Sequence, residues 1–231
     1  MRILSFLALL LIVNFSFQNN KVVQFDVRKI LNARPVSTLN NRRITTWTKG
    51  IDGGGFGDGY LTLSAALFNG DKEPHALPDN PIFAANESHP EIKLHYSNAD
   101  SLNLQTCNIA GSGQVEFAVP QQKYKAVYLA LTSSEGASQL HITLIYKTDI
   151  VTKDITLPDY YADLNPTDKS LGYLAHDLAK WGNKNNMTEK DHHNIDLLKV
   201  ETDPGKILKI ITIKKDKAGY LVFWAAAGEK A

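Results

Sequence analysis

A glycine-rich segment that runs directly into an apolar run constrains this chain more than any other feature. Residues 52–59 hold five glycines and two aspartates, and a largely apolar run at residues 61–67 follows. Glycine adopts positive φ without steric cost, and each glycine adds conformational entropy that folding must overcome. The segment therefore predicts a tight turn, with its backbone close to a ligand, a cation or another strand, and then a strand.

The first 20 residues have the pattern of an export signal. Arg2 precedes an 11-residue segment from Ile3 to Val13 that is apolar except for Ser5. This segment is shorter than the about 20 residues needed to span a bilayer. We expect residues 1–20 to be a signal peptide and residues 21–231 to form one domain, secreted or periplasmic, without a membrane span. A buried N-terminal helix or strand is the alternative.

The composition limits how the chain is stabilised and what it binds. Cys107 is the only cysteine, so no disulfide can form within the chain, and a 43% hydrophobic composition must supply the core. The 25 basic and 24 acidic residues give a net charge of +1. A balance of this kind disfavours binding to nucleic acid or to an anionic membrane surface.

Alternating apolar and polar residues in the middle of the chain predict half-buried strands. We expect strands at residues 92–96, 115–119, 125–132, 140–146, 151–157, 207–213 and 220–226. Turn-forming clusters separate the third from the fourth and the last two, which predicts two hairpins. Several short strands without intervening helices indicate an all-β protein, an antiparallel sandwich or barrel.

Two segments depart from this pattern. Residues 69–90 contain four prolines and predict a long irregular loop. Residues 159–196 form a second excursion, in which apolar residues recur at spacings of three and four. That periodicity predicts a short amphipathic helix at residues 170–181. Function tends to lie in such connecting segments.

Four segments, at residues 51–67, 113–120, 124–146 and 206–224, together resemble the galactose-binding-like (discoidin-like) β-sandwiches found beside bacterial glycoside hydrolases. The resemblance implies an antiparallel sandwich of jelly-roll type. Such domains often bind carbohydrate, sometimes with a structural calcium ion, at loops on one end of the sandwich, and many are structural spacers. Residues 147–150 lack the glycine expected at a turn, and the 159–196 excursion is longer than usual.

Asp52 and Asp58, six residues apart in the glycine-rich segment, are candidate metal ligands. Their carboxylates and the flexible backbone carbonyls around them suit calcium, which takes six to eight oxygen ligands. The spacing is not that of an EF-hand loop. The alternative is a turn whose aspartates bond their own backbone amides.

The 159–196 excursion gathers the candidate carbohydrate-binding residues, which are Tyr160, Tyr161, Trp181, His192 and His193. Sugars stack their apolar ring faces on aromatic side chains and bond their hydroxyls to planar polar groups. The alternative is that Trp181 and one tyrosine pack against a sheet while the histidines are solvated. His192 and His193, with Asp191, Asp196 or His176 as partners, are also candidate ligands of a transition metal. Adjacent histidines on regular backbone point in different directions, which disfavours such a site.

No catalytic motif stands out. The glycine-rich segment lacks the Lys-Ser or Lys-Thr of a P-loop, and no G-x-S-x-G elbow is present. We therefore expect an exported, non-catalytic carbohydrate-binding module whose partner is a glycan. The alternatives are a glycan-active hydrolase or lyase that uses residues 159–196, and a structural or protein-interaction module of a surface assembly.

Overall fold

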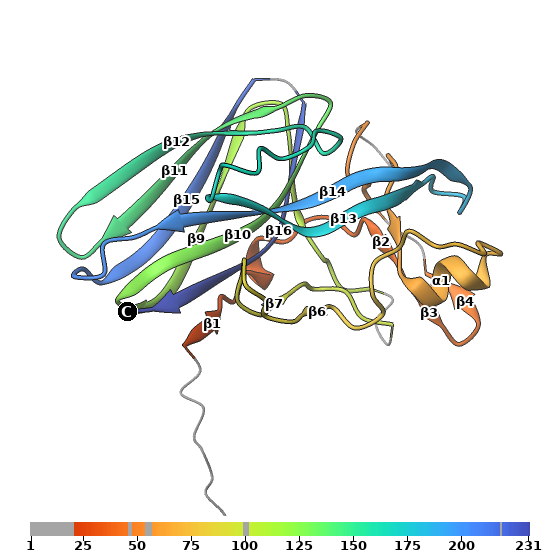
Figure 1. Ribbon diagram of the computed structural model, residues 1–231, viewed down its shortest axis with the longest axis horizontal. Coiled ribbons are helices and arrows are strands. Elements are labelled where there is room, and N and C mark those ends of the chain that lie inside the picture. Colours follow the sequence, from red (N-terminus) through yellow and green to blue (C-terminus); the bar gives the residue numbers. More distant parts are fainter. Residues whose placement is uncertain (1–20, 46–47, 54–56, 99–101, 218) are drawn as a thin grey trace, which may run out of the picture.

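The structure is a computed structural model that describes residues 21–45, 48–53, 57–98, 102–217 and 219–231. The expected signal peptide, residues 1–20, and residues 54–56 of the glycine-rich segment lie outside these ranges. The protein is all-β, as expected, with two large antiparallel sheets (Figure 1). None of the helices among the described residues has the length and hydropathy to cross a membrane.

The smaller of the two large sheets has four strands in the order β12-β11-β15-β9. They are β9 (Gly113–Gln122), β11 (Ser138–Tyr146), β12 (Ile150–Leu157) and β15 (Leu208–Asp216). Along β11, Leu140, Ile142 and Leu144 are fully buried and alternate with more exposed residues. One face of this sheet therefore meets the core and the other meets solvent.

The larger sheet has the order β1-β16-β10-β14-β13, and β8 also pairs with β16. Its strands are β1 (Val22–Gln24), β8 (Cys107–Ala110), β10 (Tyr124–Ser134), β13 (Leu171–Trp181), β14 (Met187–Glu201) and β16 (Tyr220–Lys230). The central strand β10 is buried at every position except Lys125. A strand without alternation is covered on both faces, which its nearly continuous apolar sequence reflects.

Each face of the six-stranded sheet carries its own hydrophobic cluster. The first cluster lies between the two large sheets and includes Phe117, Leu129, Ile142 and Phe223. The second lies on the opposite face, where Tyr128 and Trp224 meet side chains from the N-terminal half of the chain. The six-stranded sheet is thus the middle layer of the molecule.

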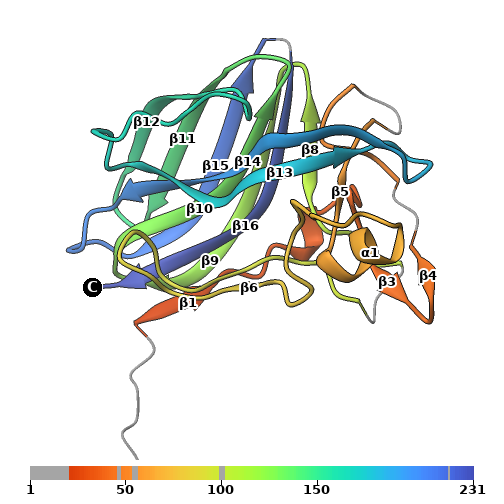
Figure 2. The ribbon, with the colours of Figure 1, turned by 45° about the vertical axis from the view of Figure 1, so that its right-hand side comes forward.

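The N-terminal half covers the second face with short elements (Figure 2). These are η1 (Arg28–Ile30), β2 (Val36–Ser37), β3 (Leu39–Asn40), β4 (Arg43–Ile44), β5 (Tyr60–Leu61), α1 (Leu63–Phe68), β6 (Ile82–Phe83) and β7 (Ile92–Lys93). Most of residues 69–90 is irregular, as their prolines predict. The expected strand at residues 92–96 is shorter than predicted.

Neither predicted hairpin exists, although the strands themselves do. β10 and β11 follow one another in the chain but belong to different sheets, and so do β15 and β16. The actual hairpins include β11 with β12, and β13 with β14. Two successive strands have the same sequence pattern whether they pair as a hairpin or belong to different sheets. Sequence periodicity therefore could not distinguish a hairpin from a connection between sheets.

The helix predicted at residues 170–181 is wrong, because these residues form strand β13. Pairing with β14 is interrupted by register shifts along its length. Each bulge adds a residue to one strand and so breaks the period of two. Leu174 and Leu178, four residues apart, share one face, as a strand also allows, whereas Leu171 packs against the cluster on the other face.

The strand predicted at residues 61–67 is also wrong beyond Leu61, since the chain turns into α1. Alanine is the strongest helix former, and Ala65 and Ala66 are fully buried. Asp79 satisfies the first turn, because its carboxylate accepts hydrogen bonds from the Ser64 amide at 3.0 Å and the Ser64 hydroxyl at 2.5 Å. The one short α-helix among the described residues is therefore outside the 159–196 excursion.

Strand β14 carries an aspartate inside the core. Asp196 is 1% exposed, and neither carboxylate oxygen has a hydrogen-bond partner among the described residues. Burial, with a smaller contribution from the charge of Asp159, raises the pKa of Asp196 from its ordinary value of 3.8 to about 7. The unfolded chain therefore releases this proton at lower pH than the folded protein does.

The free energy of unfolding should fall as the pH rises from about 4 to about 7 and should then level off. Asp196 should account for a fall on the order of 4 kcal/mol. Asp196→Asn removes the charge, so we expect it to be more stable than the wild type at pH 8 and similar at pH 4.5. Urea unfolding at both pH values measures this, with Asp163→Asn at an exposed position as the control. An equal loss in Asp196→Asn at both pH values would contradict the prediction.

Candidate functional site

The glycine-rich segment is a turn in which backbone approaches backbone. The Ile51 amide donates to the Asp58 carbonyl at 2.6 Å, and the Asp58 amide donates to Asp52 Oδ1 at 3.0 Å. A Cβ at Gly57, whose φ is +48°, would lie 2.1 Å from the Asp52 carbonyl oxygen, and a Cβ at Gly50 would lie 2.1 Å from that of Asp58. Glycine is therefore required at both positions by the turn itself.

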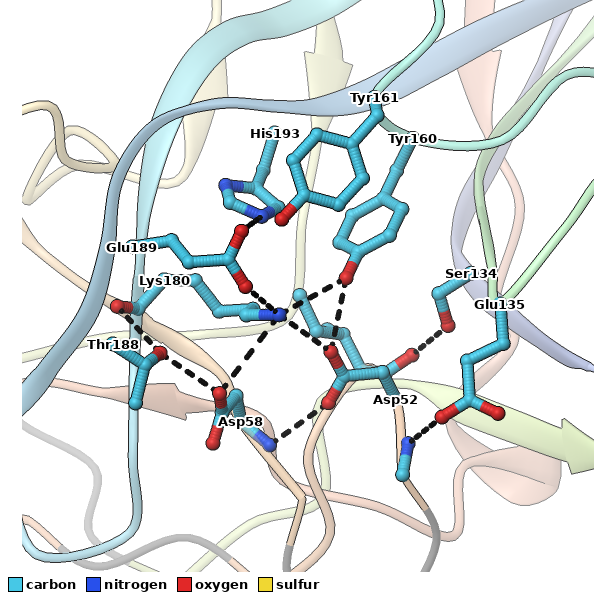
Figure 3. Close-up of polar contacts among 12 residues, drawn as sticks. Asp52, Asp58, Ser134, Glu135, Tyr160, Tyr161, Lys180, Thr188, Glu189 and His193 are labelled. Carbon is cyan, nitrogen blue, oxygen red and sulfur yellow. Dashed lines mark hydrogen bonds and ion pairs between the residues drawn. The ribbon is translucent and has the colours of Figure 1, made fainter.

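This turn presents its two carboxylates to the buried ammonium of Lys180 (Figure 3). Lys180 Nζ lies 3.1 Å from Asp52 Oδ2 and 3.9 Å from Asp58 Oδ2, and it also forms an ion pair with Glu189. The Lys180 side chain is 9% exposed. A buried ammonium requires charged partners of this kind to offset the loss of hydration.

The two strands of the β13–β14 hairpin supply the other side of this ion cluster. Lys180 on β13 and Glu189 on β14 are register partners, so their side chains lie on the same face. Thr188 Oγ1 donates to Asp58 Oδ2 at 2.8 Å, and a second contact of 3.1 Å joins it to the Lys180 carbonyl oxygen. The hairpin and the glycine-rich turn are thereby held together.

Tyr160 enters the cluster from the segment after β12. Its hydroxyl donates to Asp52 Oδ2 at 3.0 Å and accepts from Lys180 Nζ at 3.2 Å. Burial, followed by the charge of Asp52, raises the pKa of Tyr160 well above its ordinary value. The hydroxyl therefore stays protonated and serves as a fixed donor to the carboxylate.

Tyr160, Tyr161 and His193 form a compact aromatic group beside Lys180. The ring centroids are 4.8 Å apart for Tyr160 and Tyr161, 4.8 Å for Tyr160 and His193, and 4.5 Å for Tyr161 and His193. Tyr160 and His193 are buried, while Tyr161 is 43% exposed. One member of the aromatic group is therefore partly open to solvent next to a cluster of charged groups.

His193 contributes an unused hydrogen-bond acceptor. Its Nδ1 donates to the Leu178 carbonyl at 2.9 Å, and burial lowers its pKa, so the ring is neutral at pH 7. Nε2 then carries the lone pair. That atom is buried without a hydrogen-bond partner among the described residues and lies 3.6 Å from Glu189 Oε2.

Negative charge exceeds positive charge in the cluster, since three carboxylates surround one ammonium. Burial first, and then the charges of Asp52 and Asp58, raise the pKa of Glu189. Glu189 is 38% exposed at its side chain, so part of this acceptor surface faces solvent beside Tyr161. The arrangement favours ligands that donate hydrogen bonds, such as polyhydroxylated molecules.

The structure separates the five expected carbohydrate-binding residues. Tyr160, Tyr161 and His193 come together, whereas Trp181 is 3% exposed and packs in a small cluster with Ala65 and Ala66 of α1. His192 is 75% exposed at its side chain and lies near carboxylates on the hairpin's outer side. His193 instead points inward, where its Nδ1 donates a hydrogen bond to the Leu178 carbonyl.

The sequence interpretation missed Lys180 and Glu189, which occupy the centre of the cluster. One signal was available, because Lys180 stands between apolar Ala179 and Trp181, where a lysine needs a partner if it is buried. Assigning the segment to a helix concealed its pairing with Glu189. Calcium at Asp52 and Asp58 stays a prediction, and the ammonium of Lys180 already lies between these carboxylates and opposes their charge.

Lys180→Met should destabilise the fold by about 3–5 kcal/mol, because it leaves the buried carboxylate of Asp52 without its cation. Lys206→Met is the matched control. Lys206 also bridges two carboxylates, at 2.6 Å from Asp149 and 3.2 Å from Asp203, but in a partly exposed position where solvent screens the charges. Urea unfolding at pH 7 should show a much smaller loss for this variant. Equal losses would contradict the structural role assigned to Lys180.

In comparisons with known proteins, no protein-family model matches the chain, and no curated protein matches it significantly.

Proposed function

We propose that this protein is an exported, non-catalytic carbohydrate-binding module, an antiparallel β-sandwich of the galactose-binding-like, jelly-roll type. The shared hydrophobic cluster between the four-stranded and six-stranded sheets supports the sandwich architecture. Its strands also cross between the sheets at β10–β11 and β15–β16, as chains do in sandwiches. Export through residues 1–20, to a secreted or periplasmic location, is part of this proposal.

The observation that carries the proposed function is the exposed ring of Tyr161 beside the Lys180 cluster (Figure 3). A sugar ring stacks its apolar face on such an aromatic surface. The sugar hydroxyls can then donate hydrogen bonds to the carboxylate of Glu189, whose side chain is partly exposed. Glu189 Oε2 also lies 3.6 Å from His193 Nε2. A small saccharide site requires an apolar surface for the sugar ring and, next to it, polar groups that bond the sugar hydroxyls.

The buried members of the cluster give this site its rigidity. Tyr160 packs against Tyr161 with its hydroxyl fixed by Asp52, and its amide donates to the Ser133 carbonyl at 2.8 Å. The Gly53 amide donates to Glu135 at 3.0 Å, which joins the turn to the loop after β10. Because these groups are held before a ligand arrives, binding costs little ordering of the protein.

Tyr161→Ala should weaken glycan binding about tenfold or more by removing the stacking surface, whereas Tyr161→Phe, which retains the ring, should bind nearly as the wild type does. A glycan array identifies the ligand, and calorimetry compares the variants. Unchanged binding by Tyr161→Ala would place the sugar elsewhere.

Two further experiments, a polysaccharide incubation and a pull-down, separate the competing functions. New reducing ends or unsaturated products after incubation with a polysaccharide panel would show a glycan-active hydrolase or lyase. A blank array together with a specific protein partner in pull-downs would show a structural or interaction module.

A structural calcium ion at Asp52 and Asp58 is also part of this proposal. The ion would have to displace the ammonium of Lys180 from between the two carboxylates. If calcium binds there, treatment with a chelator should lower the melting temperature, and added calcium should restore it. Thermal unfolding with and without chelator measures this. An unchanged melting temperature would contradict the calcium proposal and leave the glycan proposal intact.

A further inference from the structure

The outer side of the β13–β14 hairpin holds a second group of polar side chains, separate from the Lys180 cluster. Asp177 on β13 and His192 on β14 both have positive φ, at +60° and +75°. The pairing register also shifts between Ala175 and Leu178. These irregularities interrupt the usual alternation of side chains between the two faces of a strand. The side chains of Asp191 and His192 therefore lie close together although the residues are adjacent in sequence.

The ligand atoms of Asp177, Asp191 and His192 lie within 4.8 Å of one another. His192 Nε2 is 3.1 Å from Asp191 Oδ1, and His192 Nδ1 is 3.8 Å from Asp177 Oδ1. All three side chains are partly exposed, at 37% for Asp177, 34% for Asp191 and 75% for His192. Small side-chain rotations are therefore free to bring the atoms into one coordination sphere.

Asp177 is held in place by groups around it. The His192 amide donates to Asp177 Oδ1 at 3.0 Å, and His75 Nδ1 lies 2.9 Å from Asp177 Oδ2. Metal ligands characteristically have an outer shell of this kind, which fixes their orientation.

An open cavity of about 430 Å³ borders this group. Its lining includes His75, His176 and Asp177, together with Glu73 from the preceding loop. The Ala179 amide donates to the His75 carbonyl at 2.7 Å, which fixes the loop against β13. Water or a ligand can therefore reach the Asp177 side of the group and complete the coordination of an ion.

We propose that Asp177, Asp191 and His192 form a binding site for a divalent first-row transition ion such as zinc. The mixture of two carboxylates and one imidazole suits zinc better than calcium or magnesium, which prefer oxygen ligands alone. Three protein ligands leave the fourth position of a tetrahedral zinc ion for water or another ligand. This inference does not depend on the proposed glycan function.

His141 provides a comparison, because both of its ring nitrogens lie within hydrogen-bond distance of a carboxylate. His141 lies between Asp154 and Asp216, with nitrogen-to-oxygen distances of 2.6 Å and 2.7 Å. Hydrogen bonds to Asp216 and then Asp154 raise the pKa of His141. The two contacts of His192 are longer, at 3.1 Å and 3.8 Å, so its nitrogens are less firmly engaged.

The test is calorimetric titration of the full chain with zinc chloride in a non-chelating buffer at pH 7.5. We expect one zinc ion per chain with a dissociation constant below about 100 μM. His192→Asn and Asp177→Asn should each weaken binding more than about tenfold. Asparagine tolerates positive φ, so both variants keep the backbone conformation, which circular dichroism and the melting temperature verify.

His141→Asn is the matched control and should bind zinc as the wild type does. Titration with copper(II) provides a second measurement, since its electron paramagnetic resonance spectrum should show coupling to an imidazole nitrogen that disappears in His192→Asn. Absence of zinc binding at 1 mM, about ten times the expected limit, would overturn the proposal. Equal weakening by His141→Asn, or an unchanged copper spectrum in folded His192→Asn, would overturn it as well.

Discussion

Burial of strands β10 and β16 on both faces is the constraint on which the rest of the structure depends. Along β10, Val127 and Leu129 contact the cluster between the two large sheets, whereas Tyr128 and Ala130 contact the cluster on the other side. Burying a leucine side chain contributes about 1.5–3 kcal/mol. Neither face can therefore be left to solvent. The four-stranded sheet covers one face and the N-terminal half of the chain covers the other.

This layered arrangement brings the glycine-rich turn to the β13–β14 hairpin. The turn belongs to the N-terminal layer and the hairpin extends the six-stranded sheet, and an isolated bridge between Gly59 and Trp181 joins their backbones. Lys180 then forms ion pairs across the contact to Asp52. Buried ion pairs contribute modestly to net stability but are costly to break, so they select one docking of the two segments over others.

The strand pattern could be predicted from the sequence because burial on one face imposes a period of two. Residues 115–119, 140–146 and 151–157 all lie in observed strands. Strand pairing could not be predicted in the same way. β10 and β11 meet different neighbours, and that choice depends on which faces close the core, a property of the whole chain rather than of the turn between them. The leucines of β13 likewise imitated a helical spacing, because Leu171 packs against one cluster while Leu174 and Leu178 pack against the other, on the opposite face of the sheet.

The sequence by itself determined that the chain is all-β, that glycine is needed at the turn before Asp58, and that aromatic residues and histidines are concentrated after Asp159. Only the tertiary structure decided which of them meet. It placed Tyr161 at the surface, buried Trp181, and set Lys180 between carboxylates more than 120 residues away. The physical reason is that local periodicity records which face of a strand is buried, whereas a charged cluster forms only where packing of distant layers removes its members from water together.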